Sequence, residues 1–84
     1  MQYVYVLQSK IDGNLYVGCT NNLKERLKLH NSKKVPSTKN RVPFMLIHYE
    51  AFTSKNDAFD RERFLKTGWG KNQIYKLLSN YFRS

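Results

Sequence analysis

Two short runs of β-branched and aromatic residues near the start of the chain predict a β-hairpin. Residues 3–7 (Tyr-Val-Tyr-Val-Leu) are apolar on both faces, as is typical of an interior strand that is covered on two sides. Residues 15–18 (Leu-Tyr-Val-Gly) follow residues 12–14 (Asp-Gly-Asn), whose turn chemistry predicts a two-residue loop. For either two-residue loop that these residues allow, the sequence numbers of two residues that pair across the hairpin add up to an odd number. Odd-numbered residues of the first strand then share a face with even-numbered residues of the second, so we expect Tyr5 and Tyr16 on the same face of the sheet.

The segment after this hairpin has the periodicity of an amphipathic helix. Asn22 followed by Glu25 resembles a capping box with Asn as the cap. Leu23 and Leu27 mark the side of the helix that we expect to be buried. We therefore predict a helix that begins after Asn22 and packs on the sheet through its leucines.

Two basic side chains lean toward the buried side of the same helix. On a helical wheel His30 falls within the leucine stripe and Arg26 lies on its edge. One interpretation is that the Arg covers apolar surface and that a backbone carbonyl satisfies the His. The other interpretation is that both residues belong to a functional site.

Residues 32–44 form a basic connection that lacks hydrophobic periodicity and contains two prolines. Its basic residues are Lys33, Lys34, Lys39 and Arg41. The connection is either a solvated loop or a rim that contacts the phosphates of a nucleic acid. Residues 45–52 then predict a third strand, apolar on both faces except at His48 and Glu50.

A carboxylate occupies the inward stripe of the second predicted helix. Ser54 and Asp57 open this helix as the cap and the acidic partner of a capping box. Ala58, Glu62 and Leu65 then recur at i, i+4 and i+7, so that Glu62 lies where an apolar residue is expected. An ionised Glu in that position costs several kcal/mol unless it is paired or bound to a cation. Glu62 is therefore either the partner of a neighbouring Arg, or a metal ligand or general acid/base.

The end of the chain predicts a third helix. Residues 67–70 (Thr-Gly-Trp-Gly) are expected to break the second helix through their glycines. Residues 71–82 resume helical spacing with one apolar face, formed by Ile74, Leu77, Leu78 and Tyr81. We interpret Trp69 as a core or hinge anchor rather than as a platform on which a nucleobase stacks. Three strands with covering helices predict a small α/β (α+β) fold in a single domain, residues 1–84.

The charge of the chain indicates a polyanionic partner. Lys and Arg number 15 against 6 acidic residues, which gives a formal net charge of +9. Nucleic acid fits this charge better than an anionic membrane does, since the sequence has no amphipathic anchor, lipidation signal or long apolar run. Cys19 is the only cysteine, which excludes an internal disulfide and a cysteine-rich zinc site. Because no secretory signal is present, we expect a reducing, cytoplasmic setting.

Five segments, in the same order and at similar spacing, resemble the GIY-YIG nuclease family and specifically its small stand-alone members. They are Tyr3-Val4-Tyr5 and Tyr16-Val17-Gly18 at the two signature tripeptides, the stretch from Gly18 to Asn31, the Ser-Thr-Lys-Asn-Arg-Val-Pro loop, and the helix from Arg61 to Lys66. The resemblance implies a three-stranded antiparallel sheet flanked by about three helices. It also implies hydrolysis of phosphodiester bonds in DNA by an endonuclease with one divalent metal ion, Mg²⁺ or Mn²⁺.

The resemblance also implies roles for individual residues. It places the catalytic groups of the family on Tyr5, Tyr16, Arg26 and His30, and its metal-binding glutamate on Glu62. Gly18 is then the structural glycine of the second tripeptide. We further expect a set of residues to contact the nucleic acid, namely Thr20, Lys33, Lys34, Lys39, Arg41 and Lys66.

The chemistry of phosphodiester hydrolysis gives these residues a reason to be together. The reaction needs an activated water and neutralised charge in its transition state. One carboxylate such as Glu62 can hold a hydrated Mg²⁺, and Arg26 can bridge phosphate oxygens. One of Tyr5 and Tyr16 is expected to deprotonate the water, directly or with His30, and the sequence does not assign which. This interpretation requires Glu62 on the same face of the sheet as the tyrosines and the arginine.

Two other functions are compatible with the sequence. The first is a non-catalytic basic module that binds nucleic acid and retains the nuclease fold. The second is a protein-interaction domain that uses the aromatic surface, which leaves the inward-facing charged residues unexplained. No motif assigns a substrate structure, a sequence preference, DNA over RNA or an oligomeric state.

Overall fold

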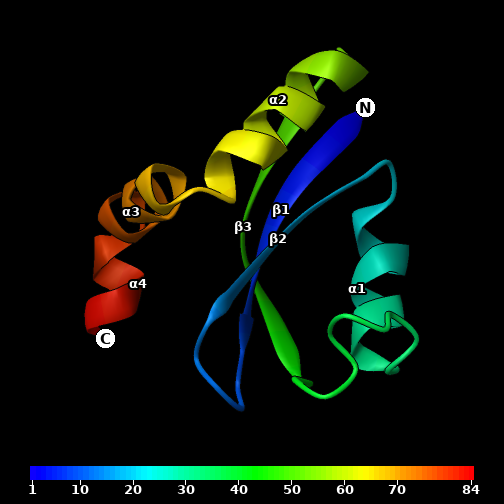
Figure 1. Ribbon diagram of the computed structural model, residues 1–84, viewed down its shortest axis with the longest axis vertical. Helices are drawn as coiled ribbons and strands as arrows, with labels where there is room; N and C mark the ends of the chain where they lie inside the picture. The colour runs from blue at the N-terminus through cyan, green and yellow to red at the C-terminus, as the bar shows by residue number, and fades with distance from the viewer.

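In a computed structural model that describes residues 1–84, helices lie on both faces of one three-stranded antiparallel sheet (Figure 1). The strand order is β2-β1-β3, so the first strand is central. The strands are β1 (Gln2–Ser9), β2 (Leu15–Thr20) and β3 (Phe44–Phe52). The helices are α1 (Leu23–Asn31), α2 (Lys55–Leu65), α3 (Gly68–Leu77) and α4 (Ser79–Arg83). The predicted fold class is confirmed, with four helices in place of about three.

The register of the hairpin puts both signature tyrosines on one face. Tyr5 pairs with Gly18 and Leu7 pairs with Tyr16. Directly paired residues of an antiparallel sheet point to the same side, so Tyr5 and Tyr16 share a face, as the parity of the sequence predicts.

The predicted two-residue loop of this hairpin is wrong. Ser9 and Leu15 end and begin the two strands, and the backbone N–H of Ser9 donates to the carbonyl of Asn14 across a wider loop (3.0 Å). The Ser9 hydroxyl accepts hydrogen bonds from the backbone N–H groups of Ile11 and Asp12 (3.1 and 3.3 Å). These side-chain bonds satisfy backbone groups that a tight turn would pair with the opposite strand.

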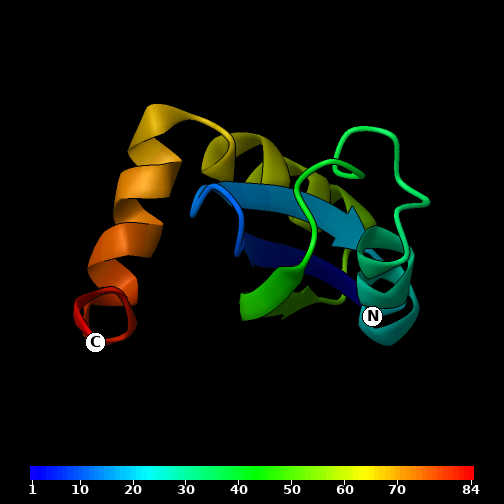
Figure 2. The same cartoon turned by 90° about the horizontal axis from the view of Figure 1, so that it is seen from below.

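The two faces of the sheet carry separate apolar clusters. Val4 and Val6 face α2 and α3, and they pack with Ala58, Leu65 and other buried residues of that layer. Tyr5, Leu7 and Phe44 belong to the cluster on the other face, against which the leucines of α1 pack. Figure 2 shows α1 and the loop after it on one side of the sheet, away from α3 and α4.

Both predicted helix caps are present. The Asn22 side chain accepts a hydrogen bond from the backbone N–H of Glu25 (3.1 Å). The Ser54 hydroxyl accepts one from the backbone N–H of Asp57 (3.3 Å). Each bond satisfies a donor that the first turn of a helix leaves free, which is why these boundaries can be read from local sequence. No helix of the chain combines the length and apolar character needed to cross a membrane.

The last part of the chain differs from the prediction. The third helix begins at Gly68, where Thr67 caps it by accepting from the backbone N–H of Gly70 (3.1 Å), and Leu78 separates it from α4. Gly70 is buried where a Cβ would overlap the carbonyl oxygen of Phe64, so this glycine lets two helices approach instead of breaking one. The interpretation of Trp69 as a core anchor is wrong, because 81% of this residue is exposed.

A half-buried ion network ties α2 to β3. Arg61 donates through Nε and Nη2 to the two carboxylate oxygens of Glu50 (2.9 and 3.2 Å). The same carboxylate lies 3.0 Å from Nε2 of His48. Burial acts to raise the pKa of Glu50, but the bonds from Arg61 and His48 outweigh it and hold the pKa below its usual 4.5. The network fixes the position of α2 on the sheet.

Glu50→Gln is expected to lower the free energy of unfolding at pH 7 by about 2 kcal/mol, because it leaves the Arg61 guanidinium half-buried without its charge partner. The depressed pKa means that this stabilisation is complete above pH 4.5 and is lost as the pH falls through the folded-state value. Urea unfolding at pH 7 and pH 3 measures both effects. Asp60→Asn is the control, since its pair with Arg63 is exposed and should change stability by less than about 0.5 kcal/mol. Equal effects of the two substitutions would contradict the role of the network.

Candidate active site

A chain of buried hydrogen bonds joins β1, α1 and the basic loop. The Tyr5 hydroxyl lies 2.9 Å from Nε2 of His30, and Nδ1 of His30 lies 2.8 Å from the Thr38 hydroxyl. Tyr5 is 2% exposed, and His30 and Thr38 are fully buried. Three segments that are distant in sequence therefore meet at one imidazole.

We infer the tautomer of His30 from the hydrogen bonds of the Thr38 hydroxyl. This hydroxyl donates to the carbonyl of Val35 (3.4 Å), so its oxygen is left to accept a hydrogen bond from Nδ1–H. Nε2 then carries the lone pair, and the Tyr5 O–H donates to it. His30 is thus arranged as the acceptor of the Tyr5 proton.

Burial and charge keep both partners neutral. Burial raises the pKa of the Tyr5 phenol above its usual 10.0, and electrostatic interaction with Tyr16 and with the Glu62 carboxylate raises it further against the lowering influence of Arg26. Burial also lowers the pKa of His30 below 6.5, and the Arg26 guanidinium lowers it further. Near neutral pH the pair is therefore a phenol that donates to an unprotonated imidazole.

Gly18 allows the Tyr5 ring to reach the edge of the sheet. A Cβ at Gly18 would overlap the hydroxyl oxygen and the Cζ atom of Tyr5, so the ring lies directly across this position. Gly18 belongs to β2, which is an edge strand. The phenol is thereby carried from the central strand to the rim of the sheet, over a position that has no room for a side chain.

Aromatic rings enclose the imidazole. The ring centroid of His30 lies 5.0 Å from that of Tyr16 and 6.0 Å from that of Phe44, in edge-to-face arrangements. Tyr5 and Tyr16 are 6.5 Å apart by the same measure. These rings exclude water from His30 and position the second signature tyrosine beside the first.

The placement of α2 corrects one expectation. The helix that carries Glu62 packs through Ala58 and Leu65 on the face opposite Tyr5 and Tyr16, so the requirement that all of these lie on one face is not met. Nevertheless the carboxylate of Glu62 is close enough to the Tyr5 hydroxyl for its charge to raise the pKa of that phenol. The candidate residues therefore come from helices on both faces of the sheet, with α1 on one face and α2 on the other.

Glu62 does not pair with a neighbouring arginine. Its carboxylate lies 3.2 Å from Nζ of Lys66, one turn further along the helix, while the adjacent Arg61 is held by Glu50. The Glu62 side chain is 20% exposed and that of Lys66 is 53% exposed. A flexible, mostly solvated ammonium is a weak partner, so the carboxylate is available to a stronger one.

The residues present fit a hydrated Mg²⁺ or Mn²⁺. No cluster of three or more His, Cys, Asp or Glu side chains could enclose a metal ion in this chain. Mg²⁺ does not need such a cluster, because it keeps several waters and is commonly held by one or two carboxylates together with substrate oxygens. Glu62 offers one hard oxygen donor at the edge where Tyr5 ends, which suits that mode of binding.

Apart from Lys66, which is described above, the residues predicted to contact nucleic acid divide into two groups. Lys33, Lys34 and Lys39 are exposed on the loop between α1 and β3. Arg41 is committed elsewhere, since it bonds to Asp12 (2.8 Å) and its guanidinium covers the ring of a neighbouring phenylalanine. The Thr20 side chain is buried and accepts from the backbone N–H of Asn22 (3.1 Å), so its role is local.

Sequence reasoning missed Thr38 and Phe44. Thr38 lies within the Ser-Thr-Lys-Asn-Arg-Val-Pro segment, and a lone threonine in a basic loop gives no local sign of being buried. Phe44 begins β3, and the Asn31 side chain donates to its carbonyl (3.1 Å) and accepts from its N–H (2.7 Å). The available signal was the end of the first predicted helix, because His30 and Asn31 both hold the loop against the site.

Comparison with known proteins places these features in a family. The model of the GIY-YIG catalytic domain matches residues 1–76. A UPF0213 protein of Clostridium perfringens is 41% identical over 95% of this chain and 85% of its own length, and one of Staphylococcus haemolyticus is 39% identical over 90% and 92%. The solution NMR structure of a UPF0213 protein from Bacillus halodurans is similar, with a TM-score of 0.58 and 38% identity over 92% of this chain and 85% of that one.

Proposed function

The chain belongs to the GIY-YIG catalytic domain family and to the UPF0213 proteins, and we propose that it is a metal-dependent endonuclease that hydrolyses phosphodiester bonds in DNA. The observation that carries this proposal is the buried Tyr5–His30–Thr38 chain of hydrogen bonds. It ends at the sheet edge with the Tyr5 hydroxyl, whose pKa the charge of Glu62 raises. This arrangement puts a proton acceptor beside a phenol on which a carboxylate and a guanidinium both act.

The Tyr5–His30 pair supplies the base for the attacking water. A phenol whose pKa is raised does not ionise by itself near neutral pH, so Tyr5 can take a proton from water only as it passes its own to Nε2 of His30. The tautomer set by Thr38 keeps Nε2 free for that proton. We therefore assign the base to the pair rather than to either residue, and we leave Tyr16 to orient the water or the phosphate.

Groups from helices on both faces of the sheet would neutralise the negative charge of the reacting phosphate. Arg26 acts on Tyr5 and His30, so its guanidinium lies where it can bridge phosphate oxygens. Glu62 would hold the divalent ion, which when bound supplies Lewis-acid neutralisation of the phosphate. Lys33, Lys34 and Lys39 form an exposed basic rim that we propose contacts the flanking phosphates.

Cleavage of supercoiled plasmid tests the proposed function. We expect the purified chain to nick the plasmid with Mg²⁺ or Mn²⁺ and to stop when EDTA removes the ion. Nicked, flapped, branched and single-stranded substrates, each as DNA and RNA, define what is cut. Tight binding without cleavage of any substrate would instead support the non-catalytic module. Loss of binding as salt rises is expected of both, because counterion release drives either.

The pH dependence of cleavage should follow His30. Its imidazole accepts a proton only when neutral, and burial and Arg26 hold its pKa below 6.5. Single-turnover cleavage is therefore expected to stay constant as the pH falls to 6.5 and to decline only at lower pH. His30→Gln should reduce the rate about 100-fold and remove this acidic limb. An acidic limb that persists unchanged in the variant would show that His30 is not the proton acceptor.

A further inference from the structure

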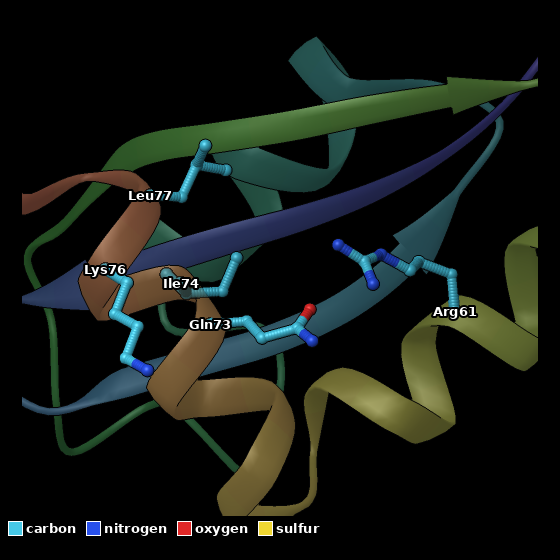
Figure 3. Close-up of a pocket in the computed structure, with 5 residues that line it drawn as sticks. All are labelled: Arg61, Gln73, Ile74, Lys76 and Leu77. Carbon is cyan, nitrogen blue, oxygen red and sulfur yellow. The ribbon is translucent and has the colours of Figure 1, made fainter.

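The angle between α2 and α3 forms a groove that the proposed catalytic residues do not use. We call it the α2–α3 groove and define it by two hollows of about 440 and 400 Å³, which lie on either side of Gln73 and Lys76. Its other lining residues are Arg61, Phe64, Trp69, Asn72, Ile74 and Leu77. Figure 3 shows the Arg61 and Gln73 side chains pointing into the gap between the helices, with the sheet behind them. Each hollow has the volume of a small-ligand site.

Two cations line the groove, Lys76 and the Glu50-bound Arg61, and no acidic side chain does. Neither α3 nor α4 contains an acidic residue, whereas Lys71, Lys76 and Arg83 lie on them. On α2 the carboxylates of Asp60 and Glu62 are paired with Arg63 and with Lys66 at the end of the helix. Charge complementarity therefore selects an anionic occupant.

An exposed tryptophan gives the groove a flat apolar wall. Trp69 is 81% exposed, more than any other large hydrophobic residue of the chain. The amide side chains of Asn72 and Gln73 line the same hollow, one turn further along α3. An indole face, two amides and a lysine together match a nucleotide, since the base stacks on the ring, its edge bonds to the amides and its phosphate meets the ammonium.

We propose that the α2–α3 groove binds an unpaired nucleotide of a nucleic acid, with the base on Trp69 and the phosphate at Lys76. The base must be unpaired, because a ring within a duplex has its faces covered by its neighbours. Lys66 follows α2, between Glu62 and Trp69 in the sequence, and its half-exposed ammonium is a further cation that a bound strand can contact. The site rests on nucleic acid as the proposed substrate, but not on catalysis.

The fluorescence of Trp69 reports on this site directly, because it is the only tryptophan of the chain. The full chain in EDTA is titrated with a fluorescein-labelled single-stranded oligonucleotide and with the duplex of the same sequence. We expect the single strand to quench the tryptophan and the duplex to bind, by anisotropy, without quenching it. Equal quenching by both, or none by the single strand, would overturn the proposal.

Substitutions separate the site from general charge. Trp69→Ala and Lys76→Ala are each expected to weaken binding of the single strand about tenfold and to change binding of the duplex about twofold or less. Lys55→Ala, at the far end of α2, is the control and should affect both substrates equally. Cleavage of a duplex by Trp69→Ala is measured separately. A rate equal to that of the unmodified chain would show that the endonuclease proposal does not depend on the nucleotide site.

An acidic protein segment is the competing occupant. Polyglutamate has the charge without the bases, so it should neither quench Trp69 nor compete with the oligonucleotide beyond what its ionic strength accounts for. Quenching by polyglutamate as strong as that by the single strand would overturn the nucleotide assignment and identify the groove as a docking surface for acidic peptides.

Discussion

Glu62→Gln is expected to abolish metal-dependent cleavage, with a loss of at least about 100-fold in the single-turnover rate. The amide keeps the size and shape of the side chain but cannot neutralise a divalent cation. The substitution also removes a negative charge that raises the pKa of Tyr5, which makes the phenol a stronger acid. Loss of activity in the variant should therefore not come from a Tyr5 phenol that gives up its proton less readily. The measurement is plasmid nicking across a range of Mg²⁺ and Mn²⁺ concentrations.

Asp60→Asn is the matched control for this experiment. It removes a carboxylate from the same helix, in an exposed pair with Arg63, and should leave the rate unchanged. Circular dichroism and thermal unfolding establish that both variants are folded, and stability should change little because the Lys66 partner of Glu62 is mostly solvated. Full cleavage by Glu62→Gln would remove this residue from the mechanism and leave the metal requirement without a protein ligand.

Gly18→Ala is expected to damage both stability and activity. The added methyl group would overlap the Tyr5 phenol, and neither the buried ring nor the edge strand can move away without breaking packing or pairing. Overpacking of this kind costs about 1–3 kcal/mol. A displaced phenol also loses its bond to His30, and an error of about 1 Å in a catalytic group can cost 100-fold in rate.

Gly68→Ala provides the comparison for this substitution. A Cβ at Gly68 meets nothing within 4 Å, and the residue lies in the first turn of α3, where Ala is the better helix former. We expect this variant to be as stable as the parent or slightly more stable, with the same cleavage rate. Normal activity in Gly18→Ala, despite reduced stability, would show that the position of Tyr5 on the sheet edge does not matter for cleavage.

The features that local sequence predicts well are those with local physical causes. The caps at Asn22 and Ser54 depend on hydrogen bonds between residues three apart, and both are observed. The shared face of Tyr5 and Tyr16 depends only on the two-residue repeat of a strand and the parity of the hairpin. The inward position of His30 follows from helical periodicity, and the residue is fully buried.

The predictions that fail depend on contacts between distant segments. The hairpin loop is wider than a tight turn because Ser9 bonds to its backbone, and the serine is itself held by the carbonyl of Arg41 (2.6 Å). Gly70 lies within α3, and its lack of a side chain is needed because the carbonyl of Phe64 packs against it. Trp69 is exposed because Ile74, on another side of the same helix, fills the core.

The candidate site shows the same division. The sequence by itself determined which side chains face inward, since periodicities of 2 and 3.6 residues assign each residue to one side of its own element. It could not determine which face of the sheet α2 covers, nor that Thr38 would set the tautomer of His30, because no local repeat relates one element to another. Only the tertiary structure decided that Tyr5 crosses Gly18 to the edge of β2, where Arg26 and Glu62 act on it from elements packed on opposite faces.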